Sequence, residues 1–259
     1  MRKSQSMIYV DGIPLSAVDN DLVVSSINEG AVSMNPTASS LGRSWGQHLD
    51  LMEMRSKDIT LTFVAAKPRD LERRATLIDA LIRWAAGEHK IKLSYKPDRY
   101  LLATCVTFPQ IQDLYKWTNA LTVTWRAYDV PFWQADQSSK VSTTVSASSS
   151  RSQFVSNVGT AETPLRVAYT PTESLHEIYI SDGSNTIGIN GLNISAGTAL
   201  SIDVDSADRL VVTAGGTSFL SNVTTDSADL LMVKPGGTTF SVYADAAGTC
   251  SMISKARWY

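Results

Sequence analysis

Three carboxylates lie close together in the segment 203–208, where Asp203, Asp205 and Asp208 form the densest group of potential metal ligands in the chain. Carboxylates at such short spacing can chelate a hard cation such as calcium. The spacing differs from that of an EF-hand loop, because no glycine follows the third acid and no glutamate closes the loop. We therefore expect a strand that ends in an Asp-rich turn, with carboxylates bonded to the local backbone, and no metal site.

Residue types that would serve a catalytic centre are few and scattered. The histidines are His48, His89 and His176, and no serine lies in a Gly-x-Ser-x-Gly elbow. Cys105 and Cys250 have no CxxC partner, and no glycine-rich phosphate loop precedes a helix. We therefore expect no catalytic residue, no cofactor and no enzymatic activity. The paired carboxylates of a glycosidase stay open at this point, because their separation depends on the fold.

Charge and hydropathy argue against two further classes of protein. The 259 residues include 23 Lys and Arg against 25 Asp and Glu, so the chain lacks the basic character of proteins that wrap nucleic acid. No segment approaches the roughly 18 apolar residues of a membrane span, and no apolar run follows the basic residues Arg2 and Lys3 as in a signal peptide. Isolated cysteines indicate a reducing compartment. We expect a protein that neither crosses a membrane nor carries a secretion signal.

Aromatic residues gather in three segments of the first half, two of which also contain Arg or Lys, and such groups can stack on bases or sugars. Trp125 shares a period-two face with Leu121 and Val123, which indicates a core residue. The better candidates for a contact surface or a domain junction are Trp117, Phe132 and Trp133.

The elements of the first half, residues 1–137, predict a mainly β domain with one helix. Asp11-Gly12 interrupts an apolar run and predicts a hairpin over 7–15, because this pair tolerates the positive φ angles of a tight turn. A helix is predicted from Pro68 to Gly87, with the apolar stripe Leu71, Ala75, Ile78, Ile82 and Ala85. Strands are predicted at 59–64, 90–96, 100–108 and 121–128. The stretch from Asn28 to Asp50 shows no period and predicts a long functional loop.

The second half of the chain differs from the first in amino-acid composition. Residues 138–150 are nearly all small and polar, which predicts a linker or an exposed edge strand between a domain at 1–137 and a domain at 151–259. Short apolar runs then recur at spacings of about ten residues and are separated by Gly-containing turns, as in a β-sandwich or jelly roll. The predicted strands are 165–169, 177–180, 186–189, 199–204, 209–213, 230–233, 239–243 and 249–254.

The order of these elements resembles that of siphophage distal tail proteins, the Dit family, over most of the chain. In the first half the resemblance is carried by Leu81–Trp84 at the end of the helix, Ile91–Leu93, Pro97–Ala103 and Trp125–Trp133. In the second half it is carried by Asn157–Thr160, Pro164–Val167, Ser201–Asp205, Leu231–Thr238 and Arg257–Trp258.

The resemblance implies a tail-tube-like β-sandwich or barrel with one packed helix, followed by a galectin-like β-sandwich. It further implies a structural protein of the virion, assembled in the host cytoplasm. Six copies would form a ring at the distal end of a long non-contractile tail. The ring would join the tail tube protein to the tape-measure or tip protein and to the receptor-binding protein, and DNA would pass through its channel without specific binding.

Ring closure requires that one surface of each subunit meet a different surface of the next. We expect that seam in the loop 28–50 and at the exposed positions of the strand 59–64. The candidate interface residues are Trp45, Leu49, Thr60, Thr62, Trp117, Phe132 and Trp133.

The alternative function is that of a carbohydrate-binding module in an adhesin or beside a cell-wall enzyme. A galectin-like fold does not by itself imply sugar binding. The sugar-site residues of galectins, a His-x-Asn-Pro-Arg strand with a nearby Trp-Gly-x-Glu, are absent from the second half. The rings of that half that lie away from its ends are Tyr169, Tyr179 and Tyr243, and we expect them in the core because each falls within a predicted strand.

Overall fold

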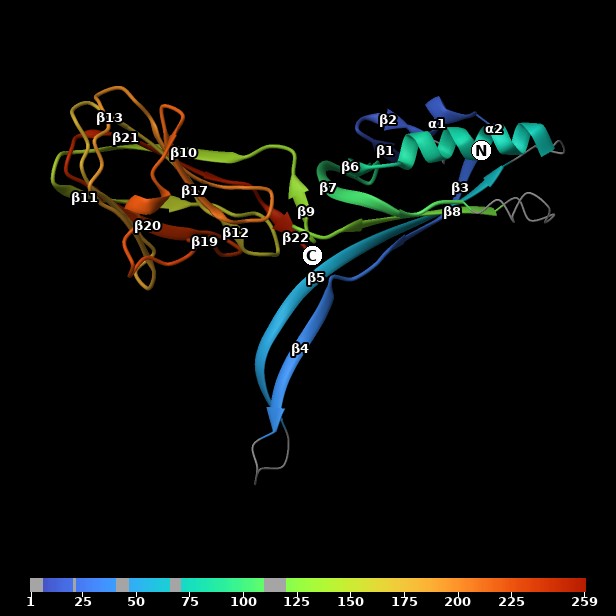
Figure 1. Ribbon diagram of the computed structural model, residues 1–259, viewed down its shortest axis with the longest axis horizontal. Helices are drawn as coiled ribbons and strands as arrows, with labels where there is room; N and C mark the ends of the chain where they lie inside the picture. The colour runs from blue at the N-terminus through green and yellow to red at the C-terminus, as the bar shows by residue number, and fades with distance from the viewer. Residues whose placement is uncertain (1–6, 21, 41–46, 66–70, 110–119) are drawn as a thin grey trace. The chain divides into compact units, whose positions relative to one another are not determined.

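The computed structural model describes residues 7–20, 22–40, 47–65, 71–109 and 120–259. The chain divides into two compact units, Met1–Trp133 with Tyr259 and Gln134–Trp258 (Figure 1). Strands dominate the secondary structure of both units, which confirms the mainly β fold class expected from the sequence.

The first unit is built on an antiparallel sheet with the strand order β2-β1-β6-β7-β8-β5-β3. The strands are β1 (Ile8–Val10), β2 (Ile13–Pro14), β3 (Leu22–Glu29), β5 (Gln47–Ala65), β6 (Glu88–Leu93), β7 (Lys96–Thr107) and β8 (Ala120–Ala127). The turn between β1 and β2 has φ angles of 48° at Asp11 and 81° at Gly12, which confirms the predicted hairpin. A short helix, α1 (Leu15–Val18), follows it.

Helix α2 (Leu71–Ala85) lies along one face of this sheet (Figure 1). The Trp84 ring packs edge-on against Phe63 and Trp125, at centroid distances of 6.4 and 5.7 Å. Trp125 is fully buried, as predicted, and its indole N–H donates a hydrogen bond to the carbonyl oxygen of Ala85 at 3.2 Å. The helix is followed by Gly87, whose φ of 106° suits a residue without a side chain.

The apolar stripe predicted for this helix is partly wrong. Ala75 is exposed and Ile82 is half-buried, although Ile78 and Ala85 are buried as expected. The side chain of Leu71 lies outside the described part of the structure, and the other described side chains of the helix that are buried are Leu77, Leu81 and Trp84. These large residues bury far more apolar area than an alanine does, so they decide which face of the helix meets the sheet.

The segment 28–50, predicted as a loop, is largely strand. β4 (Ser33–Ser40) pairs with residues 47–56 of β5, and the register shifts between Ser33 and Met34 and between Thr37 and Ala38. Bulges break the period-two alternation on which strand prediction depends, and Pro36 has low strand propensity. Within the described part of the chain, β4 and residues 47–56 pair only with each other. We call this two-stranded ribbon, residues 33–40 and 47–56, the hairpin arm.

The second unit is a sandwich of two antiparallel sheets, as the spacing of its strands predicts. The six-stranded sheet has the order β10-β21-β13-β16-β17-β18, and the four-stranded sheet has the order β11-β20-β14-β15. The six strands are β10 (Ser139–Val145), β13 (Arg166–Pro171), β16 (Leu200–Val204), β17 (Leu210–Ala214), β18 (Thr217–Ser218) and β21 (Gly248–Ser254). The four strands are β11 (Ser149–Val155), β14 (Ile178–Ser181), β15 (Thr186–Ile189) and β20 (Thr238–Ala244).

Short elements complete the description of this unit. Strand β9 (Trp133–Ala135) includes the last residue of the first unit and the first residues of the second. The others are β12 (Thr163–Pro164), β19 (Met232–Val233), β22 (Arg257–Trp258) and the 3-10 helix η2 (Leu220–Asn222). The Ser/Thr-rich stretch 138–150 forms β10 and the start of β11, which are edge strands of the two sheets.

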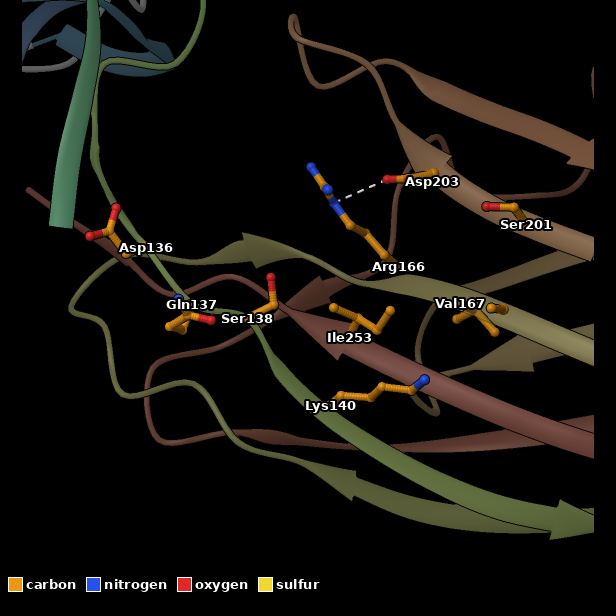
Figure 2. Close-up of a pocket in the computed structure, with 10 residues that line it drawn as sticks. Asp136, Gln137, Ser138, Lys140, Arg166, Val167, Ser201, Asp203 and Ile253 are labelled. Carbon is orange, nitrogen blue, oxygen red and sulfur yellow. Dashed lines mark ion pairs between the residues drawn. The ribbon is translucent and has the colours of Figure 1, made fainter. Parts of the chain in front are cut away.

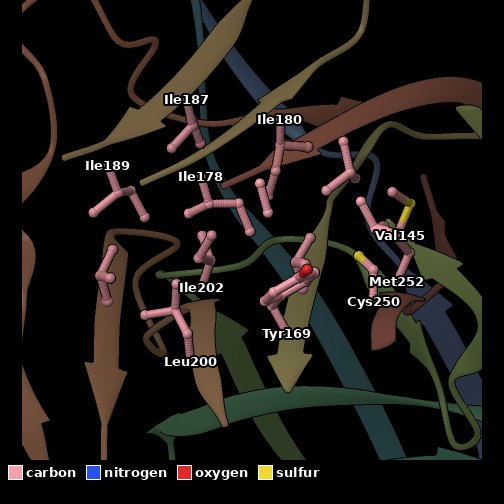
Figure 3. Packing of buried hydrophobic residues seen from close by; sticks show 14 of the residues in the cluster. Val145, Tyr169, Ile178, Ile180, Ile187, Ile189, Leu200, Ile202, Cys250 and Met252 are labelled. Atoms are coloured by element: carbon pink, nitrogen blue, oxygen red, sulfur yellow. The ribbon is translucent and has the colours of Figure 1, made fainter. Parts of the chain in front are cut away.

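A single apolar core fills the space between the two sheets of the second unit (Figure 3). Isoleucines of β14 and β15 meet Leu200 and Ile202 of β16 and the fully buried ring of Tyr169 on β13. The Tyr169 hydroxyl donates a hydrogen bond to the carbonyl oxygen of Ala246 at 2.6 Å, so its polar end is satisfied inside the core.

Candidate functional site

A polar groove lies on the outer face of the six-stranded sheet (Figure 2). It has a volume of about 440 Å³, within the range typical of ligand pockets. Its walls come from β10, β13, β16, β21 and the segment before β10. The lining residues are Asp136, Gln137, Ser138, Lys140, Arg166, Val167, Ala168, Ser201, Asp203 and Ile253.

The chemistry of the groove is that of hydrogen bonding and charge. Arg166 Nε and Asp203 Oδ1 form an ion pair at 3.0 Å, and both side chains are about two-fifths exposed or less (Figure 2). Lys140 adds a second cation at the exposed end of β10. Among the described residues that line the groove there is no histidine and no cysteine, and its serines are Ser138 and Ser201. The groove can contact a polar group through these charged and hydroxyl side chains.

The Asp cluster at 203–208 forms the turn that its sequence predicts. Asp205 Oδ1 accepts hydrogen bonds from the backbone N–H groups of Ala207 and Arg209, at 2.9 and 3.0 Å. Hydrogen bonds from the Arg209 side chain and backbone hold the pKa of Asp205 below its usual value. The three carboxylates diverge, because Asp203 pairs with Arg166 and Asp208 pairs with both terminal nitrogens of Arg257. Across the described ranges, no three His, Cys, Asp or Glu side chains converge on a common metal position.

The sheet face of the first unit opposite α2 carries a set of threonines. Thr60 and Thr62 of β5 alternate with the buried Ile59, Leu61 and Phe63, and both are half-buried. The neighbouring strand β8 contributes Thr122 and Thr124 in register with them, and the hydroxyls of Thr60 and Thr124 are 3.1 Å apart. We call these four residues the threonine face.

The other predicted interface residues lie in different surroundings. Trp45 and Trp117 lie outside the described residues, and Leu49 is in the hairpin arm, at a register position opposite Ala38. Phe132 is half-buried and stacks edge-on with Tyr259 at 5.4 Å. Trp133 is fully buried, so its ring contacts this chain's own residues.

Trp133 belongs to a polar network that sequence analysis missed. The carboxylate of Glu29 accepts hydrogen bonds from the Tyr95 hydroxyl and the Lys96 ammonium, each at 2.5 Å, and from Trp133 Nε1 at 3.2 Å. The Lys96 ammonium also lies 4.6 Å from the centre of the Trp133 ring, within the range of a cation–π contact. Lys57, only 4% exposed, is the second cation that acts on Glu29.

The charges of this network depend on one another. Burial by itself raises the pKa of Glu29, but hydrogen bonds from Lys96 and Tyr95 and the charges of Lys96 and Lys57 bring it below its usual value. Burial lowers the pKa of Lys57, and the Glu29 carboxylate counteracts that change. Glu29 ends β3 just before the hairpin arm, and Lys57 follows the arm directly in β5. The network therefore fixes the base of the arm to the sheet.

A pattern in the sequence could have revealed Lys57. It falls on the same period-two face as Ile59, Leu61 and Phe63, all of which are fully buried, and an ionisable residue at such a position needs a partner. Its carboxylate partner, Glu29, lies on another strand, and the network also joins residues far apart in sequence, because Trp133 and Glu29 are separated by 104 residues.

No family model and no curated protein sequence matches the chain. Among solved structures it is similar to SPP1 Dit (gp 19.1), described as a paradigm of the hub adsorption apparatus in phages that infect Gram-positive bacteria. That match has a TM-score of 0.67 and 15% sequence identity, and it covers 96% of this chain and 98% of that one. The chain is also similar to parts of the phage P2 baseplate in its activated conformation, solved with Ca and with Sr. Each of these has a TM-score of 0.43 and 6% identity and covers 92% of this chain and 91% of the other.

The resemblance to distal tail proteins that the order of motifs predicts is thus confirmed at the level of the fold. Neither helix in the described part of the chain combines the length and the hydropathy that a bilayer span requires.

Proposed function

We propose that this protein is a structural component of a phage tail tip, a hub in which six copies close a ring between the tail tube and the adsorption apparatus. The observation that carries the proposal is the shared fold with SPP1 Dit, which extends over almost the full length of both chains. A likeness confined to one sandwich would carry less weight, since sandwiches serve many functions.

The first unit supplies surfaces that suit ring closure. A closed ring needs two different surfaces per subunit, each complementary to the other. The threonine face is one such surface, because α2 covers the opposite side of the sheet and leaves Thr60 and Thr62 partly accessible. Threonine has high strand propensity and can hydrogen-bond across a contact without the desolvation cost of a charge.

The hairpin arm is the second such surface. Its register places Met34 opposite Met54, Pro36 opposite Met52, and Ala38 opposite Leu49. The register also places Asn35 opposite Glu53, Thr37 opposite Leu51, and Ser39 opposite His48. The arm therefore offers both apolar and polar residues along its length. A ribbon of this kind, with no other strand of the described chain beside it, suits a neighbouring subunit.

The proposed partners follow from the place of a hub in a tail. They are the tail tube protein above the ring, the tape-measure or tip protein and the receptor-binding protein below it, and DNA that passes through the central channel without specific binding. The protein would act in the virion after assembly in the host cytoplasm and would catalyse no reaction.

Mass in solution tests the proposal. Light scattering and native mass spectrometry across a series of protein concentrations should detect a species with six times the mass of the 28.1-kDa chain, because closed rings form by mass action. Electron microscopy of the same fraction should show end-on rings with sixfold symmetry. A chain that stays monomeric up to its solubility limit, or one that hydrolyses a cell-wall polymer, would contradict the proposal.

A further inference from the structure

The outer face of the four-stranded sheet in the second unit has an unusual composition. Its outward positions form transverse rows across β11, β20, β14 and β15. The first row consists of Ser150, Tyr243, Tyr179 and Gly188. The second row consists of Ser152, Ser241, Ser181 and Thr186, and Phe154 with Thr239 begins a third. We call these ten residues the tyrosine face.

The two tyrosines lie side by side on this face. Tyr179 and Tyr243 are cross-strand partners with ring centroids 6.0 Å apart and ring planes inclined by 50°. Both are only partly buried, which corrects the expectation that they belong to the core. Their neighbours along each strand, Ile178 and Val242 among them, point into the sandwich instead.

Gly188 leaves room for the Tyr179 ring beside β15. A Cβ atom at position 188 would stand 2.8 and 2.9 Å from two carbons of that ring, closer than van der Waals contact permits. The same Cβ atom would stand 3.1 Å from the Thr224 hydroxyl oxygen, so the absence of a side chain at position 188 makes room for both neighbours. Phe154, 54% exposed, supplies a third ring. It lies four residues along β11 from the residue opposite Tyr243, which is about 14 Å at the rise of a strand.

Apart from Gly188, the other residues of the tyrosine face are serines and threonines, which carry hydroxyl groups. No hydrogen bond from the Ser150, Ser152 or Ser241 hydroxyl is present within the described chain, so these groups are available to a ligand. The Ser181 hydroxyl is already engaged, by the Asn185 carbonyl oxygen and by Thr186. Among these ten described positions there is no Asp, Glu, Lys or Arg.

We propose that the tyrosine face binds a neutral glycan chain, with Tyr179, Tyr243 and Phe154 stacking on sugar rings and the serine hydroxyls bonding sugar hydroxyls. The face of a pyranose ring presents C–H groups, which pack on the electron-rich face of an aromatic ring, and its edge presents hydroxyls. The absence of formal charge among the ten residues favours a neutral polymer over nucleic acid or an acidic polysaccharide, both of which require cations. The spread of the rings along the strands suits an extended chain of several sugars.

This inference is independent of the ring proposed above. The tyrosine face lies in the second unit, on the sheet opposite the charged groove, and none of its residues belongs to the threonine face or the hairpin arm. A protein that forms no ring could still bind glycan here, and a ring-forming protein could fail to.

Affinity electrophoresis of the full-length chain tests the inference. Native gels would contain dextran, galactomannan or mixed-linkage β-glucan as neutral probes, and polygalacturonate as an acidic probe. We expect at least one neutral probe to retard the protein and polygalacturonate to leave its mobility unchanged. The double variant Tyr179→Ala/Tyr243→Ala should bind the retarding probe about tenfold more weakly or worse, a change of about 1.4 kcal/mol.

A second variant tests the same face without removing a ring. Ser241→Asp places one carboxylate at the centre of the second row and should also weaken binding about tenfold. Thr249→Asp adds a carboxylate at an exposed position on the outer face of the other sheet, outside the groove, and Tyr128→Ala removes an exposed tyrosine from the first unit. Both control variants should bind as the wild type does, and circular dichroism confirms that every variant is folded.

Three outcomes would overturn the inference. The first is that no neutral probe retards the folded wild-type chain, and the second is that binding persists unchanged in both the double variant and Ser241→Asp. The third is that Ser241→Asp dissociates an oligomer seen by light scattering, since the face would then be a contact between copies of the chain.

Discussion

The side-chain oxygen of Asn157 accepts a hydrogen bond from the backbone N–H of Gly159 at 2.9 Å. The amide nitrogen of the same side chain donates to the carbonyl oxygens of Ala161 and Val233, at 2.9 and 3.0 Å. Asn157 is 1% exposed, so its amide satisfies three buried backbone groups at once. Gly159 approaches the backbone of Arg257 so closely that a Cβ atom there would collide with it. The Asn-x-Gly segment thus joins three separate parts of the second unit.

Replacing Asn157 with Ala should destabilise the second unit strongly. The change leaves one buried N–H group and two buried carbonyl groups without the partner that the Asn157 side chain provides. We therefore expect the free energy of unfolding to fall by about 3 kcal/mol. Calorimetry should show a lower melting temperature for that unit, and hydrogen exchange should show loss of amide protection at Gly159. Asn193→Ala is a matched control, because Asn193 is exposed, and it should melt as the wild type does. Equal melting of the two variants would contradict this account.

The Glu29 network predicts how the stability of the first unit depends on pH. The pKa of Glu29 lies below its usual value of 4.5 in the folded chain, so the folded state binds its proton less tightly than the unfolded state does. Its contribution is therefore complete above about pH 4.5 and is lost as the pH falls through the folded pKa. Urea unfolding at pH 7 and pH 3, monitored by tryptophan fluorescence, measures the difference.

Glu29→Gln should remove that part of the pH dependence. At pH 7 the variant leaves the buried Lys57 without the Glu29 carboxylate, so we expect its free energy of unfolding to be about 2 kcal/mol below that of the wild type. At pH 3 the free energies of unfolding of the two proteins should differ much less. Glu88→Gln removes a carboxylate from an exposed position of β6 and should leave the pH profile unchanged. A parallel shift of the Glu29→Gln curve at both pH values would argue against an electrostatic role.

The two cysteines should differ in their reaction with alkylating agents. Burial raises the pKa of Cys250 to about 12 and that of Cys105 to about 11, against an ordinary value of 9.0. The thiolate is the reactive form, so both should react slowly with iodoacetamide at pH 8. Cys250 is fully buried and should stay unmodified until the second unit unfolds, whereas Cys105 is partly accessible.

Mass spectrometry of tryptic peptides, before and after addition of urea, measures this difference. The Cys105→Ser variant isolates the signal of Cys250. Rapid labelling of Cys250 in the native protein would show that the sandwich opens on the time scale of the reaction.

The sequence contained more information on the sandwich than on the hairpin arm. Strands such as β13, β16 and β20 alternate between buried and more exposed residues because one face of each is buried, and that alternation predicts their positions closely. The same rule places Tyr179, between Ile178 and Ile180, on the outer face, as the structure has it. A tyrosine within a strand is therefore not necessarily a core residue. It lies in the core only when it is an even number of positions away from the buried residues of the same strand.

The hairpin arm and the Glu29 network could not be predicted in this way. Bulges at Met34 and Ala38 interrupt the alternation in the arm, and its pairing is visible only once β4 and β5 are placed side by side. The network depends on contacts between residues far apart in the chain, for which a single sequence gives no register. The local sequence pattern determines which face of a strand a side chain occupies. The partner of a buried charge depends instead on the fold of the chain.

The threonine face gives the sharpest test of the proposed ring. Thr62→Glu introduces a carboxylate at a partly accessible position of β5, opposite the face that α2 covers. Burying that charge in a contact between subunits without a partner is costly, so the variant should remain monomeric at concentrations where the wild type is six times the mass of one chain. Thr76→Glu adds the same charge at an exposed position of α2 and should leave assembly intact. Light scattering of the three proteins at matched concentrations measures this, with circular dichroism as the check on folding. If the Thr62→Glu variant still formed hexameric rings, or if only the Thr76→Glu variant lost them, the contact between subunits would not be at the threonine face.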